Sequence, residues 1–396
     1  LEAAEAVCGG DVLDALSSLV EKSLLRRRER GEGEARFTML EVVREFALEA
    51  SEARGEADAA RLEFARYFKR LVEEAEPEIR GGTQVEWVRR LTREHDNVRA
   101  AMAILLAAEP TEGGAFVASV RPFWLAQSYG HSEQRTWFAR ALEAEGLPPA
   151  VRARLLNGLS SCERKFGRGD VAAAFGREAV EAARASGDRV ALGVALTGLA
   201  GALFVAGDLR ATRDVYEESV ANARESGDRF SLSVSLTGLG EVARLMGDWR
   251  AARAYYEQSL EAMGRHAHAN VNAVTLTNLG GVALEEGDFA AVAVYYREAL
   301  AMALELEDHF ITAMSLDGLA AVALHEGAGE KAALLAGAAE ALREVAGDPL
   351  DKLEQSLRDR YVAKLRATLD PATLEREWAR GREMTLREAA AAALDE

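Results

Sequence analysis

The sequence has 396 residues, is 29% charged and carries a formal net charge of −17. A chain of this length exceeds one ordinary compact domain, whereas a repeat array can grow without such a limit. The negative charge opposes broad nucleic-acid binding, which depends on cationic side chains, and it disfavours an anionic membrane surface. Alanine, leucine, glutamate and arginine dominate and strand-like alternation is almost absent, so the composition predicts an all-α fold.

Residues 1–50 predict a small winged-helix remnant. An apolar stripe over residues 12–25 indicates a helix, and a glycine-containing turn at 31–33 follows an arginine-rich stretch. Residues 37–40 form a short apolar run typical of a strand, and a new helix is expected to begin near Glu41. Helix, two strands around a turn, and helix is the order at the end of a winged-helix domain.

The arginine-rich stretch admits two interpretations. Its cations are Arg26, Arg27, Arg28 and Arg30. Winged helices often bind DNA, which favours a nucleic-acid contact. However, Glu29, Glu32 and Glu34 interleave with the cations and favour a solvated wing, which is the interpretation we prefer.

We expect residues 51–148 to form a helical linker followed by a degenerate first copy of the repeat that is described below for residues 149–348. Two or three helices are expected between residues 56 and 108, with breaks at Pro77 and at the glycines 81 and 82. Adjacent His95 and Asp96 point about 100° apart on a helix, so they predict a polar face tied to a neighbouring helix and not a metal site. Residues 115–142, which include Trp124 and Tyr129, predict the degenerate repeat, and residues 147–149 mark its end.

Residues 149–348 repeat at a fixed step of 40 residues. Three columns carry the period: Leu156, Leu196, Leu236, Leu276 and Leu316; Leu159, Leu199, Leu239, Leu279 and Leu319; and Gly167, Gly207, Gly247, Gly287 and Gly327. No insertion or deletion interrupts the five copies. A strict period of this length predicts a solenoid, in which each unit buries its apolar face against its neighbours.

Each copy predicts two helices joined by a tight turn. Leu192, Leu196, Leu199 and Leu203 recur at three- and four-residue steps and therefore share one helix face. Glycine at 207 ends that helix, because it adopts the left-handed conformation without steric cost. A second helix follows with Tyr216 on its apolar side, where a large ring fills the gap left by small residues.

Residues 349–396 lose the period and predict two or three capping helices. Asp370 and Pro371 form a good helix start, with the aspartate as cap and the proline in the first turn. A terminal unit of a solenoid must present a polar outer face, which this stretch supplies.

The repeats resemble the tetratricopeptide repeat, whose turn is matched at residues 207–209, 247–249 and 287–289. The period of 40 is longer than the usual ~34, Leu203 replaces the usual first-helix tyrosine, and the last copy lacks aromatic residues at Gly329 and Ala336. The long form is similar to the solenoid sensor domain of MalT-type bacterial regulators. The resemblance implies a right-handed superhelix whose concave face is lined by the first helix of each pair.

The N-terminal stretch resembles the junction of bacterial STAND-class regulatory ATPases of the AfsR/MalT kind, at residues 16–25 and 36–48. Residues 375–394 resemble the ending of that family's repeat domain, after which many relatives carry a LuxR-type helix-turn-helix. The missing initiator methionine and this resemblance predict that the chain is a piece of a longer regulator, with any ATPase part upstream of Leu1.

The implied concave face supplies the predicted ligand contacts. These are Asn157, Ser161, Arg164, Thr197, Phe204, Thr237, Glu241, Arg244, Thr277, Asn278 and Asp317. Small polar residues mixed with arginine and phenylalanine favour a groove for a peptide, a small polar ligand or the parent's own ATPase part. Arg164 and Arg244 could hold an anionic group through their planar guanidinium groups. The alternative is that the small residues only permit tight superhelix curvature.

The sequence offers no support for an enzyme. It has no phosphate-cradling GxxxxGK[ST] loop, no GxSxG and no HExxH motif. His266 and His268 lack a nearby third ligand, so we expect no metal and no cofactor. The two cysteines, Cys8 and Cys162, form no framework and predict a reducing cytoplasm. The sequence also predicts no signal peptide and no membrane span.

Two functions fit these observations. The preferred hypothesis is a regulatory arm of a STAND-type signalling ATPase or transcriptional regulator, which binds a ligand or protein on the concave repeat surface. Its expected partners are a protein, a peptide or a small polar ligand, including the nucleotide-binding domain of its own parent chain, and not nucleic acid or membrane. The alternative is a free-standing tetratricopeptide scaffold for protein–protein interaction.

Overall fold

The computed structural model describes residues 1–30, 34–79, 83–127, 130–264, 269–347, 350 and 352–394. The chain divides into two compact units, Leu1–Cys162 and Glu163–Glu396. Several predicted features lie outside the described residues: the turn at 31–33, the glycines 81 and 82, Tyr129, His266 and His268, and the end of the repeat array at 348 and 349.

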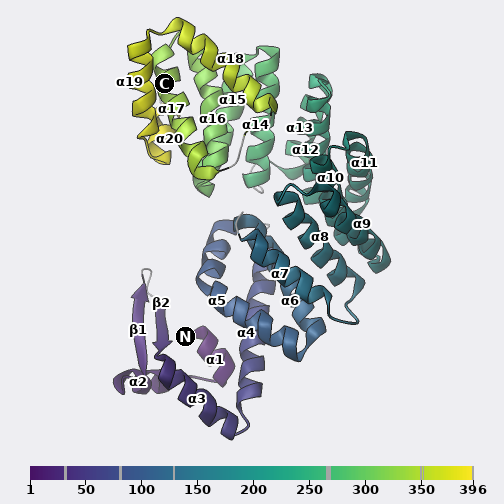
Figure 1. Cartoon of the computed structure of the whole chain (residues 1–396), viewed down its shortest axis with the longest axis vertical. Helices are drawn as coiled ribbons and strands as arrows, with labels where there is room; N and C mark the ends of the chain where they lie inside the picture. Colours follow the sequence, from purple (N-terminus) through teal and green to yellow (C-terminus); the bar gives the residue numbers. More distant parts are fainter. Residues whose placement is uncertain are drawn as a thin grey trace. The chain divides into compact units, whose positions relative to one another are not determined.

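The N-terminal segment has the predicted order of helices and strands. It consists of α1 (Glu2–Cys8), α2 (Leu13–Glu21), β1 (Leu25–Arg30), β2 (Glu34–Met39) and α3 (Glu41–Ala53). The two strands pair antiparallel, with Leu25 opposite Met39 and Arg27 opposite Phe37. The arginine-rich stretch therefore forms β1, and the predicted helix at Glu41 is confirmed (Figure 1).

The rest of the first unit is helical. It contains α4 (Ala57–Ile79), α5 (Gln84–Ala108), α6 (Pro110–Gln127), α7 (His131–Leu142) and most of α8 (Pro149–Lys165). Its core holds large apolar side chains that are almost fully buried, among them Phe68, Leu91, Met102, Phe116 and Phe123. The predicted degenerate repeat at residues 115–142 falls on α6 and α7.

The predicted break at Pro77 is wrong. Pro77 lies inside α4, which continues to Ile79. A proline removes one backbone donor and clashes with the carbonyl four residues earlier. Here α4 accommodates the proline and ends two residues after it.

The predicted tie between His95 and a neighbouring helix is confirmed. Trp124 on α6 donates its indole N–H to Nε2 of His95 on α5 at 3.4 Å, and the His95 ring contacts Phe123 edge-on. Burial lowers the pKa of His95, and the nearby Arg99 lowers it further. A neutral imidazole is the form that accepts the indole hydrogen bond.

The repeats form helical hairpins whose helices begin at the predicted interval. The first helices are α8 (Pro149–Lys165), α10 (Arg189–Ala206), α12 (Arg229–Leu245), α14 (Ala269–Glu286) and α16 (His309–His325). The second helices are α9 (Gly169–Ser186), α11 (Leu209–Ser226), α13 (Trp249–Met263), α15 (Phe289–Leu306) and α17 (Gly329–Ala346). Both series advance by 40 residues a step, so the predicted period and the all-α solenoid are confirmed. Within the second unit, Figure 1 shows consecutive hairpins lying side by side.

The turn between the two helices of a hairpin depends on a glycine and on the aspartate that follows it. Gly207 ends α10 in the left-handed conformation at φ 84°, and the side chain of Asp208 accepts the backbone N–H of Ala211 at 3.0 Å. An aspartate caps a helix well because its carboxylate satisfies backbone donors that have no partner within the helix. The glycine–aspartate pair therefore ends one helix and starts the next within two residues.

One helix among the described residues, α10, is long and apolar enough to cross a membrane by length and composition. It occupies a first-helix position in the array, packs against α9 and α11, and has 44% of its residues buried. This position in the repeat core explains its apolar composition.

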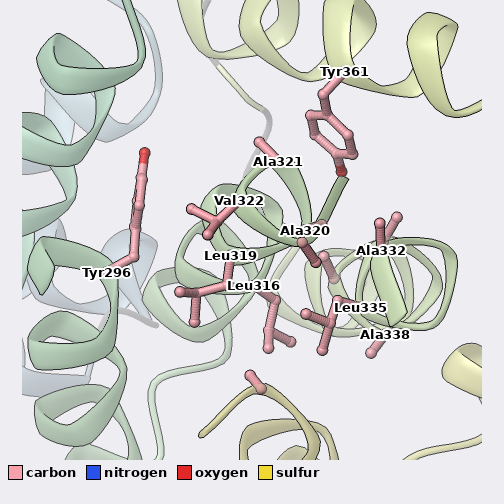
Figure 2. Close-up of a cluster of buried hydrophobic side chains, with 14 of the residues drawn as sticks. Tyr296, Leu316, Leu319, Ala320, Ala321, Val322, Ala332, Leu335, Ala338 and Tyr361 are labelled. Atoms are coloured by element: carbon pink, nitrogen blue, oxygen red, sulfur yellow. The ribbon is translucent and has the colours of Figure 1, made fainter. Parts of the chain in front are cut away.

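The C-terminal segment forms three helices: α18 (Lys352–Thr368), α19 (Pro371–Arg382) and α20 (Leu386–Leu394). Asp370 caps α19 by accepting the N–H of Thr373 at 3.0 Å, as predicted. Helix α19 packs closely on α17. A side chain added at Gly337 of α17 or at Gly381 of α19 would strike the backbone of the other helix. The core of this segment gathers residues of α15 to α17, and Tyr361 of α18 reaches toward it (Figure 2).

Tyrosines of the second helices lie against glycines of the first helices. A Cβ at Gly238 would overlap the ring of Tyr216, one at Gly240 would overlap Tyr256, and one at Gly318 would overlap Tyr296. These close approaches fix how near adjacent helices can lie, since a packed core has no room for an added methyl group.

We expect Gly318→Ala to lower the free energy of unfolding by about 1–3 kcal/mol, because the added methyl group displaces a buried ring. The matched control is Gly281→Ala, where the nearest atom to a new Cβ is Leu357 Cδ1 at 3.8 Å. That control should be neutral or stabilising by up to about 1 kcal/mol, since alanine favours helices. Urea unfolding followed by circular dichroism measures both, and equal effects of the two variants would contradict the packing argument.

Candidate ligand-binding site on the inner repeat surface

A cleft of about 340 Å³ lies between the first helices of the second unit. We call it the first cleft; it is lined by Arg164, Gly201, Phe204, Val205, Tyr216, Val234, Thr237, Gly238, Glu241, Asn270, Val271, Val274 and Asn278. Five of the predicted contact residues line it: Arg164, Phe204, Thr237, Glu241 and Asn278. We call the face of α10, α12, α14 and α16 that lines this cleft and the second cleft, described later in this subsection, the inner surface.

The walls of the first cleft are mainly apolar. Phe204 and Val205 come from α10, Val234 from α12, and Val271 and Val274 from α14. Val205 is 41% exposed and Val274 is 38% exposed, so apolar surface is open to solvent on two sides of the cleft. An apolar cleft with a few placed polar groups is the usual form of a ligand site.

Arg164 is the cation of the first cleft. A Cβ at Gly201 would lie 2.5 Å from Arg164 Nη1, so the guanidinium group rests in the space left by that glycine. Among the described residues no carboxylate forms an ion pair with Arg164. Burial raises the pKa of the neighbouring Tyr216, and its phenol therefore stays neutral. The arginine retains donors that an anionic or acceptor group can use.

Glu241 and Arg244 satisfy each other one turn further along α12. Arg244 is 5% exposed and donates Nε to Glu241 Oε1 at 2.9 Å, and its Nη2 contacts the same oxygen. The other oxygen accepts from Tyr256 and from Asn278 Nδ2, each at 3.2 Å. Burial raises the pKa of Tyr256, which keeps this phenol protonated as a donor. This network occupies the position that lies one repeat after the first cleft, between the first cleft and the second cleft described below.

The threonines of the predicted set bond within the protein. Thr197 donates to the carbonyl of Val194 at 2.9 Å, and Thr277 donates to that of Val274 at 2.8 Å. The hydroxyl of Thr237 lies 2.9 Å from that of Ser259 and 3.0 Å from that of Thr275. These hydroxyls link α12, α13 and α14.

Asp317 belongs to a second cleft of about 290 Å³, the last cleft, which α18 covers. Arg343 Nη1 donates to Asp317 Oδ2 at 2.7 Å, Tyr361 donates its hydroxyl to Oδ1, and Arg358 Nε lies 3.7 Å from Oδ1. Arg360 of α18 pairs with Glu285 on α14. The aspartate therefore anchors α18 to the inner surface.

The two clefts are equivalent under a shift of two repeats, or 80 residues. Tyr216, Val234, Thr237, Gly238 and Glu241 of the first cleft correspond to Tyr296, Met314, Asp317, Gly318 and Ala321 of the last cleft. Phe204 and Val205 correspond likewise to Leu284 and Glu285. The clefts thus share one architecture and differ in side-chain chemistry.

Asn157 and Ser161 lie on the part of α8 that belongs to the first unit. Asn157 is 2% exposed and Ser161 is half-buried. As ligand contacts, these two residues and the other nine predicted residues remain predictions.

Several cleft residues were missed in the sequence. Val205, Val271 and Val274 line the first cleft but fall outside the columns chosen for the concave face. Tyr216 was assigned to the packing between helices, and it also closes the floor of the cleft. The period itself contained the available signal, because Tyr296 and Tyr216 share a column.

No group of three His, Cys, Asp or Glu residues within the described ranges is placed to hold a metal ion.

Family comparisons agree with this architecture. Residues 192–265 match the family model of the tetratricopeptide repeat, and residues 1–51 match that of the winged helix-turn-helix domain. The chain therefore carries both kinds of segment, and the winged-helix and tetratricopeptide predictions are confirmed.

Curated relatives include proteins described as HTH-type transcriptional regulators of Mycobacterium tuberculosis and Mycobacterium bovis. They are 32% identical over 213 residues, which is 50% of this chain and 24% of theirs. The chain thus matches about a quarter of the length of these curated relatives.

Solved structures with a similar fold include a STAND protein with a tetratricopeptide repeat sensor from Pyrococcus horikoshii. It is 16% identical with a TM-score of 0.49, covering 96% of this chain and 62% of that one. A Rap protein complexed with competence and sporulation factor is 14% identical with a TM-score of 0.49, covering 83% and 99%.

We expect Glu241→Ala to lower the free energy of unfolding by about 3 kcal/mol, because it removes a charged partner of the buried Arg244. The control Glu261→Ala removes an exposed carboxylate from α13 and should change the stability by less than about 0.5 kcal/mol. The double variant Glu241→Ala/Arg244→Met should recover most of the loss, since it removes both charges. Urea unfolding of the three variants checks this, and a double variant less stable than Glu241→Ala would contradict it.

Proposed function

We propose that this chain is the regulatory sensor arm of a STAND-type signalling ATPase or transcriptional regulator, and that it binds a ligand or protein on the inner surface. The observation that carries the proposal is the first cleft. It is open, mainly apolar and provided with an arginine that has no ion pair among the described residues. A winged-helix segment and a repeat array in one chain supply the context.

The proposed arm has four parts. Residues 1–50 form the winged-helix remnant, 51–148 the helical linker with a degenerate repeat, 149–348 the five regular repeats, and 349–396 the capping helices. The net charge of −17 opposes direct nucleic-acid binding and favours protein, peptide or small polar partners. The two cysteines without a disulfide framework support a place in the cytoplasm.

Binding at the first cleft provides a physical route to regulation. The cleft takes its walls from α10, α12 and α14, which belong to three successive hairpins. A ligand that touches all three has an affinity that depends on how the hairpins are rotated against one another. Such a ligand shifts the array toward the arrangement that it binds better, by its difference in affinity between the two arrangements.

We expect a panel of short peptides and small polar metabolites to contain a compound that binds the full chain saturably, as measured by thermal shift and calorimetry. Val205→Glu should weaken that binding at least about tenfold, because it places a charge on the apolar wall of the first cleft. The matched control is Val294→Glu, which changes an exposed valine on α15 outside the cleft and should leave the affinity unchanged.

The second part of this experiment adds a nucleotide-binding domain of a STAND-class protein as a separate polypeptide. This domain is supplied with ADP or with an ATP analogue. Binding that differs between the two nucleotide states supports the regulatory proposal. Absence of saturable binding in both parts, or binding that Val205→Glu and Val294→Glu weaken equally, would contradict it.

A further inference from the structure

Three positions along the inner surface repeat one cleft, and they are treated differently. The first cleft is open, the middle position is filled by the Glu241–Arg244–Asn278 network, and the last cleft is covered by α18. The same chain therefore shows how one of its own clefts is covered.

The contacts of α18 define this mode of binding. The helix lies against α14 and α16 and places Leu357 3.8 Å from the position of a Cβ at Gly281. Tyr361 points from α18 toward α16 (Figure 2). Its hydroxyl donates to Asp317, while Arg360 pairs with Glu285. An apolar anchor, a tyrosine and a cation on one helix face thus engage two successive first helices.

We propose that the first cleft is a docking seat for an amphipathic α-helix of a partner protein, held as α18 is held in the last cleft but with a carboxylate in place of its cations. This inference rests on the proposed function and specifies the partner of the same surface. The equivalence of the two clefts after 80 residues supports a helical occupant.

Charge decides which helix fits the first cleft. The two acids that hold the cations of α18, Glu285 and Asp317, are replaced in the first cleft by Val205 and Thr237. A helix with the arginines of α18 would find no acid at these two positions, and Glu241, the acid that lines the first cleft, is already engaged by Arg244 and Asn278. The charge without an ion pair is the cation Arg164, which calls for an acidic residue on the partner.

The last cleft also indicates where that acid belongs. Glu354 of α18 lines the last cleft together with Tyr296. Arg164 lines the first cleft together with Tyr216, the counterpart of Tyr296 after 80 residues. The partner helix therefore carries its acid at the position of Glu354.

Labelled peptides test the proposal against the full chain by fluorescence anisotropy. The first peptide has the sequence 352–368 with Arg358→Ala and Arg360→Leu, which removes the mismatched cations and keeps Glu354. The second is the unchanged sequence 352–368, and the third adds Ala363→Pro to the first to prevent a helix. The first peptide should bind at least about tenfold tighter than either of the others.

Chain variants locate the binding. Arg164→Glu and Val205→Glu should each weaken the first peptide about tenfold or more, whereas Arg210→Glu, an exposed arginine of α11, should change the affinity less than about twofold. Glu285→Ala loosens the seat of α18, and an unchanged affinity in this variant excludes binding in the last cleft. Thermal unfolding of each variant checks that the fold is retained.

Three results would overturn the helical seat. The proline peptide could bind as tightly as its parent, which indicates an extended occupant. The unchanged sequence 352–368 could bind as tightly as the first peptide, or Arg164→Glu could leave the affinity unaltered. If a panel compound still binds at Val205 while the peptides fail in these ways, the proposed function stands and only the helical partner is rejected.

Discussion

The packing of a tyrosine from the second helices α11, α13 and α15 against glycines of the first helices governs the geometry of these repeats. Tyr216 meets Gly238, Tyr256 meets Gly240, and Tyr296 meets both Gly280 and Gly318. No larger residue fits at these glycines, so the ring determines how closely helices approach. Tyr216 also lines the first cleft and Tyr296 the last cleft, which means that one contact serves both the fold and the candidate site.

A shared geometry leaves each repeat free to differ in chemistry. At the column of Gly201, Glu241, Gly281 and Ala321, glycine makes room for Arg164, glutamate binds Arg244, and glycine receives Leu357. The residue in this column therefore decides whether a position is filled from within, by Glu241 and Arg244, or keeps space for another side chain, such as Arg164 or Leu357. Because neighbouring repeats interact only locally, such changes do not disturb the rest of the array.

The fold was predictable because it rests on local signals. Helix starts, glycine ends and aspartate caps depend on residues within a few positions, and the period repeats them five times. The site depends on contacts between residues far apart in sequence. Glu241 accepts a hydrogen bond from Asn278, 37 residues later, and Asp317 accepts one from Tyr361, 44 residues later. Helix α18 follows no period, so its position on the inner surface had no signal in the columns. Pro77 shows the converse, since a strong local signal failed where it fell in the last turns of a helix.

The covered last cleft bears on how the array responds to a ligand. Helix α18 ties α14 to α16 and α17 through Glu285, Asp317 and Glu340, and it thereby fixes the C-terminal repeats relative to one another. The first cleft has no covering helix among the described residues; its walls from α12 and α14 are joined by the Thr237–Thr275 and Glu241–Asn278 hydrogen bonds, and α10 packs against α12. In a solenoid each interface contributes separately to stability, and an occupant of the open cleft adds its binding energy to the interfaces that it spans. A coupling of about 1–3 kcal/mol, typical of allosteric proteins, is comparable to the packing energy of a single side chain. The open end of the array is thus the part that a bound partner can stiffen, while the clamped end holds its shape.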